Sequence, residues 1–286
     1  MRRLFFIYSI AVLAIGYGSC NIINPKEPTP YFIQIDSVSV KNTDYSLHGE
    51  VSQKITDVWV YYNNNLLGGY ELPARIPIIG DTVGSIDIQA GVLRNGMNGD
   101  RAKYPYYKLN NYPINWTAGT CRKIYPIFQY VSFDEMKMLQ HEDFEIGNSF
   151  TPLNTDTPIV KSFNAKYGNR CGLMYLDANH TQSENIITEK LALAYNTVYF
   201  LEMDYQCDVP ITVNLLCTSA SGTSTIVNVG GVNPKDKWNK MYFDIGQVVS
   251  NVRAKDYNII ISAYKPSSQS TGYAYIDNIK LIGPRK

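Results

Sequence analysis

The chain has 286 residues, of which 45% are hydrophobic and 18% charged, which is enough apolar material for packed cores and argues against a long disordered chain. Lys and Arg total 26 against 25 Asp and Glu, and this balance leaves no basic field that would hold nucleic acid. The 23 Tyr, against 3 Trp and 10 Phe, favour strands over helical bundles.

The N-terminus is typical of an exported protein. A basic start (MRR) precedes an apolar run over residues 4–15, which is too short for a well-built transmembrane helix and indicates a secretory signal. Small residues at positions 18 and 19 lead directly to Cys20, and this arrangement resembles the lipobox of bacterial lipoproteins. The resemblance implies that residues 1–19 are removed and that Cys20 carries diacylglycerol and palmitate, and two acyl chains suffice for stable anchoring. An ordinary signal peptide with a structural Cys nearby is the alternative.

Residues 20–30 carry three prolines among polar neighbours, and we expect an extended tether there. Further along, Cys121, Cys171, Cys207 and Cys217 have irregular spacings and no CxxC pair, so a metal knuckle is not supported. Export permits disulfides, and three pairings of these four residues stay open. Buried free thiols are the alternative for Cys207 and Cys217.

The first domain is predicted over residues 31–130. Apolar and polar residues alternate over 31–40, 57–62 and 84–91, as in strands, and three Asn at 63–65 predict the left-handed turn of a hairpin. The motifs DVWVY and NNNLLGGYELP resemble small β-sandwich modules of the PEGA type over residues 50–95. The resemblance implies a spacer or binding unit and no catalysis.

Tyr104, Tyr106 and Tyr107 lie in a stretch rich in Gly, Asn and Tyr, where a proline at 105 blocks strand pairing. We expect a surface loop whose rings form a ligand-binding patch, with packing over a sandwich end as the alternative. The next segment, residues 132–141, is rich in helix formers. It predicts a turn or short helix within a linker at 131–142.

The second domain is predicted over residues 143–286. Strand signals at 198–205, 211–217, 225–229, 240–245 and 258–263 fit a β-jelly roll, so the fold class is all-β with two β-sandwich domains. An opening DFEIGN and a closing YIDNIKL resemble the ends of galactose-binding-like jelly rolls, the fold of many carbohydrate-binding modules. The whole chain resembles two-domain envelope lipoproteins of the Bacteroidota.

The jelly-roll resemblance also implies a structural Ca²⁺ where the first and last strands lie side by side. The matching acids are Glu145 from the opening motif and Asp277 from the closing one. Hard oxygen ligands in flexible geometry suit Ca²⁺ better than zinc. The alternative is that Asp277 only caps a turn and Glu145 is exposed.

We expect no catalytic residues. The chain has no G-x-S-x-G, H-E-x-x-H or P-loop motif, and its three His are far apart in sequence. Of the three Trp, Trp116 is the one that we assign to sugar stacking, because it is the candidate that we expect to be most exposed. Core or semi-buried packing is the alternative for Trp116, and it is favoured for Trp59 and Trp238.

Two functions follow from these features. The first is a non-catalytic lipoprotein of the outer membrane that binds a glycan or a protein ligand. The alternative is a structural or assembly component that contacts an outer-membrane protein through Tyr104–Tyr112. Both need the membrane through the lipid anchor, and neither involves nucleic acid. Which face of the membrane carries the chain stays open.

Overall fold

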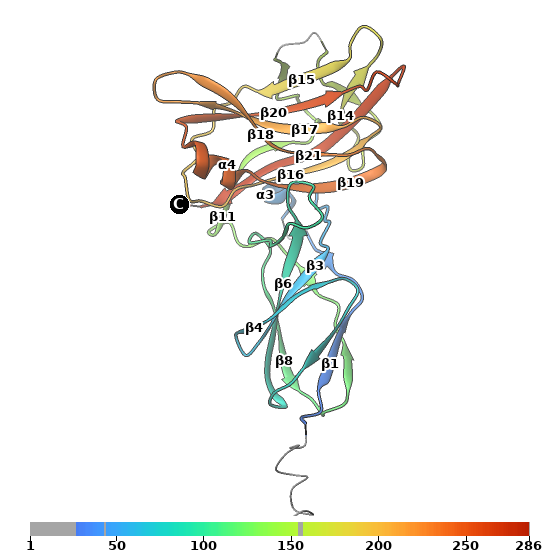
Figure 1. Cartoon of the computed structure of the whole chain (residues 1–286), viewed down its shortest axis with the longest axis vertical. Helices are drawn as coiled ribbons and strands as arrows, with labels where there is room; N and C mark the ends of the chain where they lie inside the picture. Colours follow the sequence, from blue (N-terminus) through green and yellow to red (C-terminus); the bar gives the residue numbers. More distant parts are fainter. Residues whose placement is uncertain (1–26, 43, 154–156, 286) are drawn as a thin grey trace, which may run out of the picture.

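The computed structural model describes residues 27–42, 44–153 and 157–285. Strands make up nearly all of its regular structure, and they form two bodies joined end to end (Figure 1). Strands β1 to β10 make the first body and β11 to β21 the second. The prediction of an all-β chain with two sandwich-type domains is confirmed.

The first domain packs one large sheet against smaller ones. The large sheet contains β4 (Asn65–Glu71), β3 (Asp57–Tyr62), β6 (Val83–Leu93), β7 (Arg101–Lys103) and β8 (Asn110–Asn115). Opposite it are β5 (Ala74–Ile78), β1 (Tyr31–Ile35) and β9 (Cys121–Lys123), and the short pair β2 (Ser39–Val40) and β10 (Ile127–Phe128). A short helix, α3 (Tyr45–His48), follows β2.

The β3–β4 hairpin forms as the Asn run predicts. Asn63 and Asn64 have φ angles of 45° and 64°, and Tyr62 pairs with Asn65 across the turn. Two left-handed residues match the twist of the flanking strands, and Asn tolerates that conformation better than most residues. The strand predicted over 31–40 is interrupted after Ile35 and resumes as β2.

The second domain is a sandwich of two sheets. One contains β13 (Val160–Ser162), β14 (Cys171–Leu176), β21 (Gly272–Pro284), β16 (Phe200–Cys207) and β19 (Lys235–Asp244) in this order, with β11 (Met136–Glu142) also paired to β21. The other contains β12 (Phe150–Pro152), β15 (Gln182–Ile187), β20 (Asp256–Tyr264), β17 (Ile211–Thr218) and β18 (Ser224–Val232). Helix α4 (Ile245–Val252) follows β19. Within the described residues, no helix is long and apolar enough to cross a membrane.

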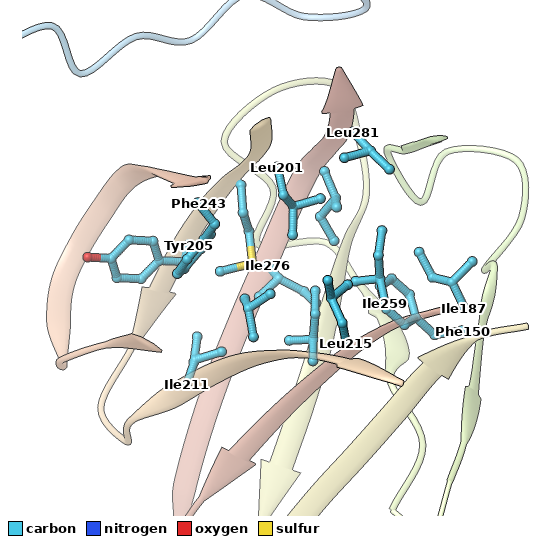
Figure 2. Close-up of a cluster of buried hydrophobic side chains, with 14 of the residues drawn as sticks. Phe150, Ile187, Leu201, Tyr205, Ile211, Leu215, Phe243, Ile259, Ile276 and Leu281 are labelled. Carbon is cyan, nitrogen blue, oxygen red and sulfur yellow. The ribbon is translucent and has the colours of Figure 1, made fainter. Parts of the chain in front are cut away.

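The core of this sandwich comes from alternate residues of the facing strands. Leu201 of β16 and Ile276 of β21 meet Leu215 of β17 and Ile259 of β20 between the two sheets (Figure 2). Because the side-chain period of a strand is two, the odd-numbered residues of β21 from Tyr273 to Asp277 face the other way. These residues lie on the outer face of the six-stranded sheet.

The prediction of a turn or short helix within a linker at 131–142 is wrong. Residues 136–142 form strand β11, which pairs antiparallel with β21 from Glu142 opposite Ile279 to Met136 opposite Pro284. A free sheet edge outweighs weak helix propensity, because the strand gains both ladder hydrogen bonds and side-chain burial. The first strand of the domain therefore precedes the DFEIGN motif, and it does lie beside the last strand.

Candidate functional site

The tyrosines expected to form an exposed patch are buried. Tyr104, Tyr106 and Tyr107 are each less than 5% exposed, because the second domain covers them. The Tyr104 hydroxyl donates a hydrogen bond to Glu202 of β16, and the Tyr106 hydroxyl donates one to the carbonyl of Val198. The expectation of a surface patch is thus wrong. The rings of Tyr104, Tyr106 and Tyr107 are also inaccessible to the protein partner that was predicted to contact Tyr104–Tyr112.

A network of buried charges joins the two domains. Lys240 Nζ lies 2.6 Å from Glu202 Oε2, and neither side chain has access to solvent. Burial alone raises the pKa of Glu202, but Lys240 and Lys280 together hold it below its ordinary value. Tyr130 of the first domain donates a hydrogen bond of 2.8 Å to the same carboxylate. The charges are therefore paired within the junction, which fixes how the domains meet.

Ser52 extends this network from the first domain into the sheet of the second. Its hydroxyl donates to Asp204 and accepts hydrogen bonds from Lys240 at 2.9 Å and from the Asn278 amide at 3.1 Å. The sequence reasoning missed these residues. The available signal was the presence of ionisable residues at alternate positions of strands that are otherwise apolar, such as Glu202 and Asp204.

Trp116, expected to be exposed, is only 8% exposed. Its ring packs edge-on against Tyr31, with centroids 4.7 Å apart and planes at 87°. Such edge-to-face packing is a preferred arrangement of aromatic pairs in cores. The expectation of a sugar-stacking role for Trp116 is wrong in this fold, because no ring face is free.

The acids proposed for calcium lie in different surroundings. Glu145 Oε1 accepts hydrogen bonds of 2.6 and 2.8 Å from the backbone amides of Asn169 and Arg170. Asp277 is buried, its Oδ1 accepts a hydrogen bond from the amide of Asn278, and its Oδ2 has no partner. Burial raises the pKa of Asp277 to about 8, and the charge of the Asp204 carboxylate adds to this effect.

The orphaned Asp277 oxygen suits a cation, whereas the Glu145 carboxylate is already held by amides. Among the described residues, His, Cys, Asp and Glu form no group of three or more that is arranged to hold a metal ion. Calcium at Glu145 and Asp277 therefore stays a prediction.

The cysteines of the described chain are free thiols. Cys171, Cys207 and Cys217 are buried and Cys121 is exposed, so the alternative of buried thiols holds for Cys207 and Cys217. Burial raises the pKa of Cys171 to about 12 and that of Cys207 to about 11, so both stay protonated and unreactive at neutral pH. Cys20 lies outside the described residues.

An aromatic row crosses the open part of the outer face of the six-stranded sheet. It consists of Tyr175 on β14, Tyr273 and Tyr275 on β21, and Trp238 on β19. Tyr175 pairs directly with Tyr273 across the strands, and the rings of Tyr273 and Tyr275 are 5.2 Å apart. The Tyr275 and Trp238 rings are 6.5 Å apart. Three of the rings thus lie within 6.5 Å of a neighbouring ring, and Tyr175, opposite Tyr273 in the register, extends the same surface.

The first domain leaves this row open. Residues of the same sheet face nearer the junction, such as Lys240 and Lys280, are buried, whereas Tyr175 is 51% exposed and Trp238, Tyr273 and Tyr275 are half-buried. The face is therefore divided between a covered junction and an accessible aromatic surface.

Amide side chains lie beside the row. Gln206, opposite Tyr275 in the register, donates a hydrogen bond of 2.7 Å to the carbonyl of Asp236 and accepts one of 3.2 Å from Asn164. Lys166 reaches the same face and pairs with Asp204 at 3.1 Å. The row thus combines flat apolar rings with hydrogen-bonding groups at its border.

No protein-family model and no curated protein sequence matches this chain. One similar solved structure is the CBM22-1 xylan-binding domain of Xyn10C from Paenibacillus barcinonensis, at 12% identity and a TM-score of 0.40, over 54% of this chain and 99% of that one. Another is TmCBM61 in complex with β-1,4-galactotriose, at 17% identity and a TM-score of 0.32, over 49% and 92% of the chains.

A third is the enzymatically active domain of tailspike protein 4 from bacteriophage CBA120, at 9% identity and a TM-score of 0.39, over 58% and 26%. At identities and TM-scores this low, none of these likenesses bears on what this chain binds.

Proposed function

We propose that this chain is a non-catalytic protein that binds a glycan along the aromatic row. The observation that carries the proposal is the aromatic surface of Tyr175, Tyr273, Tyr275 and Trp238, left open by the first domain. Flat aromatic faces cover the apolar faces of sugar rings, and the hydroxyl and indole N–H groups supply polar contacts at the ring edges.

The length of the row suits an oligosaccharide. It spans β14, β21, β16 and β19, and three intervals of ~4.8 Å between strands make roughly 14 Å. Gln206 and Asn164 lie at its border, where they can exchange their mutual hydrogen bond for bonds to sugar hydroxyls. A short linear stretch of sugar rings therefore fits across the strands.

A glycan array with the mature chain tests the proposal, followed by calorimetry on Tyr275→Ala and Trp238→Ala. Each variant should bind the selected glycan about tenfold more weakly or worse, as expected if a lost stacking contact contributes about 1.4 kcal/mol. Tyr195→Ala is the matched control, because Tyr195 is 58% exposed but lies outside the row. Unchanged affinity in both row variants would contradict the proposal.

We also propose that the chain acts at the cell envelope, held on the outer membrane by acyl chains on Cys20. The support is the sequence of residues 1–20, which lie outside the described structure. Metabolic labelling with palmitate should mark the wild-type chain and leave Cys20→Ala unlabelled. Equal labelling of both chains, or of neither, would rule out the anchor.

A further inference from the structure

A pocket of 310 Å³ opens where the two domains meet at the edge of β19. The first domain contributes Lys54 and Asn98 to its lining, and the second contributes Lys235, Asn239 and Lys240. Its volume lies at the lower end of the range for small-molecule sites, about 300 to 1,000 Å³. The pocket thus has room for one sugar ring with its substituent.

The segment between β6 and β7 forms one wall of this pocket, and specific contacts hold it in place. The amide of Asn95 donates a hydrogen bond of 2.9 Å to the carbonyl of Tyr242, and Arg94 pairs with Asp244 at 2.9 Å. Gly96 has a φ of 79°, and a side chain there would collide with the carbonyl of Gly231. This close approach of two backbones brings the wall against β18 and β19, so the pocket is built by both domains.

The charge of the pocket is positive. Lys240 is neutralised by Glu202, but Lys54 and Lys235 are exposed and have no ion pair within the described part of the chain. None of the described residues that line the pocket is Asp or Glu, and Asn98, Asn233 and Asn239 add amide donors. The nearest acid along β19 is Asp236, an exposed residue outside the lining. Two uncompensated ammonium groups and several amides suit an anionic group.

The pocket and the aromatic row share strand β19. β19 is the outermost strand of its sheet, and Trp238 lies on it between Lys235 and Asn239, which both line the pocket. A ligand that crosses the row from Tyr175 to Trp238 therefore ends on the edge strand whose residues line the pocket.

We propose that this pocket binds a negatively charged substituent, a carboxylate or a sulfate ester, of the glycan whose rings lie on the row. The ligand of the chain is then an acidic glycan. This inference rests on the proposed function and adds the chemical class of its ligand. Lys54 and Lys235 hold the charge, while the aromatic row holds the sugar rings.

Calorimetry with matched pairs of probes tests the inference on the mature chain. One pair is an oligogalacturonate and its methyl ester, and the other is a sulfated dextran oligosaccharide and its unsulfated parent. We expect one acidic probe to bind at least tenfold more tightly than its neutral counterpart, with the preference decreasing as salt is added. The pair that shows the preference identifies carboxylate or sulfate as the group that is bound.

The double variant Lys54→Gln and Lys235→Gln should bind the acidic probe no better than the neutral one. Lys237→Gln is the matched control, because Lys237 is an exposed residue of β19 outside the lining. Equal affinities within both pairs, or a preference that survives in the double variant, would overturn the inference and leave the proposed function standing. Failure of all four probes to bind, or neutral binding that Trp238→Ala leaves intact, would count against both.

Discussion

Glu202 and Lys240 occupy neighbouring strands, and their opposite charges meet at 2.6 Å without access to water. Removing an ion from water is costly, and only a close partner with further hydrogen bonds offsets that cost. Here Tyr104 and Tyr130 of the first domain complete the shell around the carboxylate. The pair therefore depends on the first domain remaining docked.

Loss of one partner should destabilise the chain strongly. Lys240→Met leaves the Glu202 carboxylate without its closest cation, and an unpaired buried charge costs about 3–5 kcal/mol. Urea unfolding of the full chain measures this change. Lys237→Met, at an exposed position of β19, should change stability by less than about 0.5 kcal/mol. A loss below about 1 kcal/mol in Lys240→Met would show that the pair is not essential to the junction.

Single residues also show where sequence reasoning fails. Trp116 directly follows strand β8 and is the Trp expected to be exposed, yet Tyr31 from a distant strand packs against it. Trp238 lies just before the strand predicted at 240–245 and is expected to pack, yet it lies within β19 and contributes to the accessible row. In both cases the exposure of the ring depends on tertiary neighbours that the local pattern does not specify.

At the scale of elements, the strands of the second domain follow from local alternation of apolar and polar residues. The signals at 211–217 and 258–263 correspond to β17 and β20 within two residues at each end. The prediction fails for β11, because only its pairing with β21 decides against the helix formers. The aromatic row could not be predicted for a similar reason. Tyr175 lies beside Tyr273 only through the register of two strands that are far apart in sequence.

The calcium site predicted at Glu145 and Asp277 lies close to the pairing of β11 with β21, because Glu145 follows β11 and Asp277 belongs to β21. If Glu145 and Asp277 share an ion, EDTA should lower the thermal midpoint of the chain by several degrees, because binding to the folded state alone stabilises it. Asp277→Ala should abolish the EDTA effect, and Asp236→Ala, at an exposed position, should retain it. A midpoint that EDTA leaves unchanged would reduce Asp277 to a residue that caps its own turn.

At the scale of the whole molecule, the two domains act as one unit joined by buried side chains. The sequence indicates two domains joined by a linker, but strand β11 and the charged network replace that linker with a docked interface. The described chain begins at the end of the first domain that lies opposite the second domain (Figure 1). If the acyl anchor proposed on Cys20 holds that end at a membrane, the aromatic row lies on the far side of the molecule. This arrangement suits a protein that presents a binding surface outward.

The fluorescence of Trp238 reports directly whether a glycan binds on the aromatic row. A chain with Trp59→Phe and Trp116→Phe retains Trp238 as its single Trp, and circular dichroism checks that it still folds. Titration with the glycan selected on the array should change Trp238 emission saturably, with the same dissociation constant that calorimetry gives. Binding seen by calorimetry without any change in Trp238 emission would place the glycan away from the aromatic row and contradict the proposed binding site.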